Sequence, residues 1–81
     1  MKILTQDKGH LIDTAGADIF VKEDSAGCFE LVLEKKQSKH SLGTYEEYEH
    51  AIRELRRVYV YINANYKLYE MRSARYYVGR Y

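Results

Sequence analysis

The sequence predicts an α+β domain in which a small, mainly antiparallel sheet of short strands is covered by one amphipathic helix. The observations behind this prediction are apolar alternation within residues 1–43, helical apolar spacing from about residue 44 to 63, and renewed alternation afterwards. With 81 residues, the chain fits a single domain, 1–81, with a compact core. Hydrophobic residues make up 46% of it and charged residues 31%, which is typical of a folded globular protein.

The pattern of apolar and turn-forming residues in the first 43 positions predicts several strands separated by turns. The segments "KILT" and "HLID" flank "QDKG", where Asp7 and Gly9 favour a tight turn, so this region predicts a hairpin. Next come "DIFVK" and "CFELVLEKK", and in the second of these Phe29, Leu31 and Leu33 share one face. After the polar turn "KKQSK", the segment "HSLGT" predicts a short strand that ends at Gly43.

A helix is predicted from about Thr44 to Asn63. Thr44 followed by Glu47 three residues later matches a capping box, which predicts the start of the helix. Helical spacing gives one apolar stripe that we expect to cover the sheet: Tyr45, Tyr48, Ala51, Ile52, Leu55, Val58, Tyr59 and Ile62. The same spacing places His50 and Tyr61 away from that stripe, on the solvent side.

After the helix, "YKLYEM" predicts a strand that returns to the sheet. A parallel neighbour fits if the helix is the crossover connection from the strand just before it. Residues 72–81 fit either a final strand or a tail, whereas a continued helix would lack a clear apolar stripe.

Charge is distributed unevenly along the chain. Residues 1–50 carry six Lys and no Arg against ten acids, whereas residues 51–81 carry six Arg and one Lys against two acids. Seven of the nine Tyr also lie in the second part. Arginine and tyrosine are enriched at binding hot spots, so this part is where we expect a partner to bind.

The residue patterns give no support for catalysis, a metal or a cofactor. His10, His40, His50 and Cys28 lack the spacing of zinc sites, and acidic neighbours on the strand face of Cys28 disfavour a thiolate. The glycines form no phosphate-binding loop. The acidic pairs have structural explanations in a turn and at a helix start. We therefore expect a non-catalytic protein without cofactors.

Cellular location follows from the cysteine count and the start of the chain. One cysteine excludes an internal disulfide, and "MKILTQDKGH" lacks the apolar core of a signal peptide. No apolar run approaches the length needed to cross a bilayer. These features predict a cytoplasmic protein that does not bind membranes.

The expected function is binding to a protein partner, with homodimerisation through an exposed strand edge as a second expectation. The expected partner-binding residues combine arginines, tyrosines and one valine: Arg53, Arg56, Arg57, Val60, Tyr61, Arg72, Arg75, Tyr76, Tyr77, Arg80 and Tyr81. The alternative is a nucleic-acid-binding module that uses arginine charge and tyrosine stacking in "RSARYYVGRY". An isoelectric point near 7.8 and the absence of a ribonucleoprotein motif favour the protein partner.

The chain resembles short uncharacterised proteins of low-GC Gram-positive bacteria and their phages. The resemblance lies in "MKILTQDK", "FELVLE", "LGTYEEYEHAIREL" and "KLYEM" and extends over residues 1–71. It implies a phage-associated or mobile-element-associated protein acting in the host cytoplasm, for example by inhibiting a host or bacterial defence component. It implies no site residues, because it rests on the layout of the chain and not on a diagnostic motif.

Overall fold

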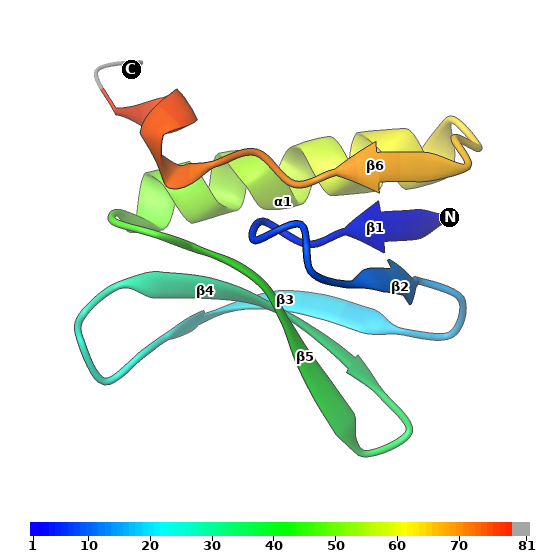
Figure 1. Ribbon diagram of the computed structural model, residues 1–81, viewed down its shortest axis with the longest axis horizontal. Coiled ribbons are helices and arrows are strands. Elements are labelled where there is room, and N and C mark those ends of the chain that lie inside the picture. Colours follow the sequence, from blue (N-terminus) through cyan, green and yellow to red (C-terminus); the bar gives the residue numbers. More distant parts are fainter. Residues whose placement is uncertain (79–81) are drawn as a thin grey trace.

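The computed structural model describes residues 1–78. This part of the chain forms two three-stranded sheets with one α-helix packed against them (Figure 1). The first sheet has the order β2 (Leu11–Asp13), β1 (Lys2–Leu4) and β6 (Leu68–Glu70). The second has the order β3 (Asp18–Glu23), β4 (Phe29–Lys35) and β5 (Ser38–Tyr45). The helix α1 spans Tyr48–Asn63, and the 3₁₀ helix η1 spans Ala74–Tyr77. The predicted α+β class is confirmed.

The first sheet joins the two ends of the domain. β1 pairs antiparallel with β2, with Ile3 opposite Ile12, which confirms the predicted hairpin. In its turn, the Asp7 carboxylate accepts a hydrogen bond from the Gly9 backbone N–H at 2.8 Å. On its other side β1 pairs in parallel with β6, where Ile3 lies opposite Tyr69. The predicted C-terminal strand is therefore confirmed, but its parallel neighbour is β1 and not β5, the strand before the helix, which belongs to the second sheet.

The second sheet is an antiparallel meander with β4 in the centre. Alternation sends Leu31 and Leu33 into the core, and Leu33 lies opposite Ile19 of β3. Lys36 and Gln37 connect β4 to β5 with backbone φ angles of 49° and 72°. Two successive left-handed residues match the twist of the strands that they join, so this turn fixes the register of the hairpin.

The helix begins later than predicted, and the prediction of a capping box at Thr44 is wrong. Thr44 belongs to β5, opposite Glu30 of β4. Its backbone N–H and C=O are both hydrogen-bonded to the Gln6 side chain, at 2.8 and 3.1 Å. Because these partners keep Thr44 extended, the strand continues to Tyr45 and Glu47 becomes the N-cap, without a side-chain capping bond.

The buried face of the helix is also rotated from the predicted stripe. Ala51 and Val58 lie in the core as expected, but Tyr48 and Tyr59 are exposed. His50, predicted to face solvent, is only 2% exposed, and Tyr61 is half-buried against the core instead of opposite it. This flank of the helix is buried because the chain after β6 packs alongside it.

The end of the described chain is neither a strand nor a loose tail. After β6, residues 71–78 run beside the N-terminal half of the helix and form η1 (Figure 1). Tyr77 of this segment is only 3% exposed and belongs to the hydrophobic core. Arg80 and Tyr81 lie outside the described residues.

Candidate functional site

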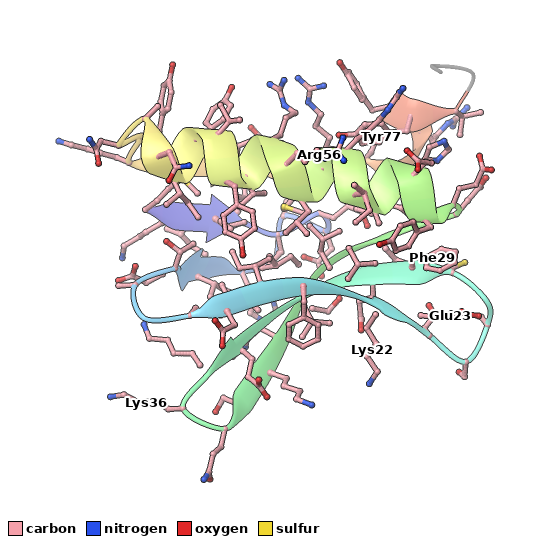
Figure 2. All side chains as sticks on the ribbon, turned by 180° about the vertical axis from the view of Figure 1, so that it is seen from behind. Lys22, Glu23, Phe29, Lys36, Arg56 and Tyr77 are labelled. Carbon is pink, nitrogen blue, oxygen red and sulfur yellow. The ribbon has the colours of Figure 1, made fainter. Side chains whose placement is uncertain are left out.

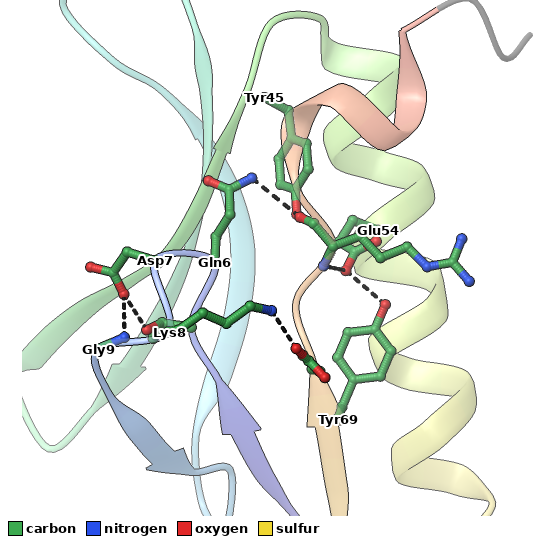
Figure 3. Close-up of polar contacts among 10 residues, drawn as sticks. Gln6, Asp7, Lys8, Gly9, Tyr45, Glu54 and Tyr69 are labelled. Carbon is green, nitrogen blue, oxygen red and sulfur yellow. Dashed lines mark hydrogen bonds and ion pairs between the residues drawn. The ribbon is translucent and has the colours of Figure 1, made fainter.

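A buried carboxylate organises the contact between the helix and the C-terminal segment. Glu54 is 0% exposed. Its Oε2 accepts hydrogen bonds from the Tyr69 hydroxyl at 2.7 Å and from the Arg72 backbone N–H at 2.9 Å. Its Oε1 accepts a hydrogen bond from the Tyr77 hydroxyl. Figure 3 shows Glu54 and Tyr69 facing each other across this contact.

The network tolerates a carboxylate in the core because its oxygens have donors. Burying a charge without partners is costly, and three hydrogen bonds offset much of that penalty. Burial raises the pKa of the Tyr69 and Tyr77 hydroxyls, and their hydrogen bonds to Glu54 add to the rise. Both tyrosines therefore stay neutral donors across the physiological pH range.

Two more side chains hold the backbone where the C-terminal segment leaves β6. The Arg72 carbonyl accepts hydrogen bonds from the Tyr45 hydroxyl at 2.6 Å and from Gln6 Nε2 at 3.2 Å. Gln6 and Tyr45 lie on the same side of that segment in Figure 3. The His50 ring also stacks on Tyr77 of this segment, with 5.7 Å between the ring centroids. The segment is thus fixed by both polar and aromatic contacts.

The Glu54 network is closed to solvent. Glu54 has no exposed surface, so a substrate cannot touch its oxygens without opening the core. Sequence reasoning missed Glu54 because only apolar residues were counted toward the buried stripe. A signal was present, since helical spacing places Glu54 on the flank of the core residues Ala51 and Val58.

The exposed side of the helix carries part of the predicted binding surface. Glu49, Arg53, Arg56 and Val60 recur at helical spacing and are all exposed, with Val60 at 61%. Figure 2 shows the helix, with Arg56 labelled, at the opposite end of the molecule from Lys22 and Lys36. The helix therefore presents arginine charge and an exposed aliphatic side chain to solvent.

Arg57 and Tyr61 do not belong to that outer row, which corrects their expected position. Arg57 is half-buried and its Nη2 donates a hydrogen bond to the Tyr61 hydroxyl at 3.2 Å. The Tyr61 ring in turn contacts Tyr66 and Tyr69, with centroids 4.5 and 4.7 Å apart. These contacts bring both side chains over the flank where β6 lies.

The C-terminal segment carries further arginines and tyrosines of the predicted binding surface. Arg75 and Tyr76 are exposed, and the Arg72 guanidinium lies over the Tyr76 ring, 3.9 Å from its centroid. Tyr77, expected at the surface, is instead buried against Glu54. Figure 2 shows the turn that carries Tyr77 beside the N-terminal half of the helix.

We use the name arginine surface for the arginines and their neighbours that these two elements present: Arg53, Arg56 and Val60 on the helix, and Arg72, Arg75 and Tyr76 on the C-terminal segment. Two acids of the surrounding chain do not oppose its charge. Glu54 is buried in its own network, and Glu70 is 2.5 Å from Lys8 Nζ. Glu49 at the start of the helix is the exposed acid of the outer row. The arginine surface is therefore positively charged.

Other site types find little support among residues 1–78. In this range, no three or more histidine, cysteine and acidic side chains come together as a metal site would require. Nor does any helix here combine the length and apolar character needed to cross a membrane. Comparison with protein-family models, curated proteins and solved structures found no match to this chain.

Proposed function

We propose that the protein is a non-catalytic binding protein whose arginine surface docks on an acidic region of a protein partner. The observation that carries this proposal is that Arg53, Arg56 and Val60 are exposed on the helix while Arg75 and Tyr76 are exposed on the segment bonded to that helix through Glu54. Arginine binds carboxylates through two parallel hydrogen bonds, and an aliphatic neighbour adds area that can be dehydrated. The proposed location is the cytoplasm, where the single Cys28 remains a thiol.

The construction of the surface also supports binding. The helix is packed on the second sheet, and the C-terminal segment is tied to the helix through Glu54, so the arginines project from a fixed backbone. Binding to a rigid surface loses less conformational entropy than binding to a mobile one. Glu54 thus supports the surface without being part of it.

A nucleic-acid partner is the second candidate, because arginines near tyrosines can hold a single strand. Stacking needs an open aromatic face. Arg72 already covers one face of Tyr76, and Tyr77 is buried. These two observations favour a protein partner.

The test compares two charge-reversed variants. In the first, Arg53 and Arg56 are both changed to Glu. In the matched control, Lys22→Glu and Lys36→Glu make the same change in net charge on the second sheet, away from the helix (Figure 2). Tagged proteins are used to recover partners from lysate with and without nuclease, and the affinity for the recovered protein is then measured directly.

We expect a discrete protein that survives nuclease, binds the control variant like the wild type and binds the arginine variant at least about tenfold more weakly. Equal binding by both variants would refute the assignment of the arginine surface. Recovery of only nuclease-sensitive material, with affinity falling linearly against salt on logarithmic axes, would establish the nucleic-acid function instead.

A further inference from the structure

We propose that the outer face of the β2–β1–β6 sheet is the contact of a weak homodimer. Alternation divides this sheet into two faces, and Ile3, Ile12 and Tyr69 point into the domain. The opposite face, which we call the outer sheet face, carries Lys2, Leu4, Leu11, Asp13, Leu68 and Glu70. Three of its six side chains are leucines, so it is unusually apolar for a solvent-facing surface.

The three leucines form one continuous patch. Leu4 and Leu11 are direct cross-strand partners, and Leu68 lies on the neighbouring strand opposite Lys2. Leu11 is 55% exposed and Leu68 is 53% exposed. A contiguous exposed apolar patch rimmed by charges is typical of a protein contact.

The charges on the outer sheet face favour a second copy of the chain as the occupant. Lys2 and Asp13 are cross-strand neighbours, and Lys8 reaches Glu70 with 2.5 Å between Nζ and Oε1 (Figure 3). With Lys8 of the adjoining turn counted, two lysines balance the two acids Asp13 and Glu70, so identical copies do not repel. The arginine surface is positive, and two copies in contact there would repel each other. The two surfaces therefore suit different partners.

The strand register also gives the face a self-complementary layout. Leu11 and Leu68 lie at diagonally opposite corners of the face, with Lys2 on one side of the line that joins them and Leu4 and Glu70 on the other. A two-fold axis along this line would place Leu11 and Leu68 of one copy on the same leucines of the second. The same axis would bring Lys2 of one copy near Glu70 of the other, so each contact would form twice.

The size of the face limits the strength of the dimer. Three-residue strands span about 10 Å, and three strands side by side span about 15 Å. This is small compared with the roughly 800 Å² that each partner buries in a stable interface. We therefore expect association only at high concentration, with a dissociation constant on the order of 0.1–1 mM.

The test is sedimentation velocity of the full chain over a range of concentrations reaching about 1 mM. A variant with Leu11→Thr and Leu68→Thr removes the exposed leucines but keeps residues that favour strands. The matched control is Val60→Thr, which makes a similar change on the exposed side of the helix. Circular dichroism checks that each variant keeps its fold.

We expect the wild type and Val60→Thr to shift toward dimer as concentration rises, and the threonine double variant to stay monomeric. Lys2→Glu alone should weaken the dimer, and adding Glu70→Lys should restore it. A monomeric wild type at the highest concentration would overturn the proposal. Unchanged association of the threonine variant would overturn it as well. Both results are independent of binding at the arginine surface.

Discussion

The Tyr77 hydroxyl donates a hydrogen bond to the Glu54 carboxylate, which joins the C-terminal segment to the centre of the helix. Both side chains are buried, so neither can exchange this partner for water. The bond explains how a segment rich in arginine and tyrosine becomes part of the core. It also makes the stability of the domain depend on one hydroxyl group.

Tyr77→Phe should therefore destabilise the domain by about 1–3 kcal/mol, because it removes a donor from a buried carboxylate. The matched control is Tyr76→Phe, which removes the hydroxyl of the exposed neighbour. Urea unfolding followed by circular dichroism measures both. Equal free energies of unfolding for the two variants would contradict the role assigned to the Glu54 network.

A chain ending at Met71 should lose most of its stability or fail to fold. The truncation removes the Arg72 N–H and the Tyr77 hydroxyl, two of the three donors to Glu54, together with the buried Tyr77 ring. Thermal melting shows the effect, with Arg75→Ser as a control that alters only an exposed side chain of the same segment. A truncated chain that melts like the wild type would show that the segment is dispensable.

Stability should fall steeply at alkaline pH. Burial raises the pKa of the hydroxyls of Tyr45, Tyr69 and Tyr77 above the ordinary value of 10.0. The folded state therefore keeps these protons at a pH where the unfolded state releases them. Their stabilisation is complete below the ordinary pKa and is lost as pH rises above it, by about 1.4 kcal/mol per pH unit for each group.

Urea unfolding at several pH values above 10.0 checks this, with tyrosinate absorbance recorded in parallel. We expect a slope of about 4 kcal/mol per pH unit when all three groups contribute. Tyr77→Phe should reduce the slope by about one third. A free energy of unfolding that does not change over this range would show that the three hydroxyls are accessible in the folded state.

Gly43→Ala should destabilise the junction between the two sheets. A Cβ at Gly43 would lie 2.9 Å from Gln6 Cβ, and the Gln6 side chain holds both Thr44 and Arg72. Displacing it costs about 1–3 kcal/mol, as in other overpacked sites. Gly9→Ala is the control, since its nearest neighbour is a carboxylate oxygen at 3.2 Å. A larger loss for Gly9→Ala in thermal melting would contradict this account.

The local patterns of the sequence predict the strands and the helix well, but they do not predict which distant residues pack against them. The hairpin at Asp7, the strand "FELVLE" and the strand around Tyr69 follow from alternation and turn residues. The helix start was wrong because Gln6, 38 residues away, holds Thr44 in an extended conformation. A local pattern carries no information about such a partner.

The arginine surface could be predicted only in part, for a related reason. Arg53, Arg56 and Val60 are exposed as expected because no element within residues 1–78 covers that side of the helix. Tyr61 and Tyr77 were placed outside the core because the position of the C-terminal segment was unknown. Once this segment covers the flank of the helix, His50 and Glu54 become interior residues as well.

The parallel pairing of β1 with β6 has a consequence for the order in which contacts form. Lys2 lies opposite Leu68, so the edge of β1 that receives β6 stays open until Leu68 has been made, although β2 can pair with the other edge early. The meander of β3, β4 and β5 requires only contacts close in sequence and can form earlier. We therefore expect the pairing of Ile3 with Tyr69 to form after the meander, as the step that closes the first sheet.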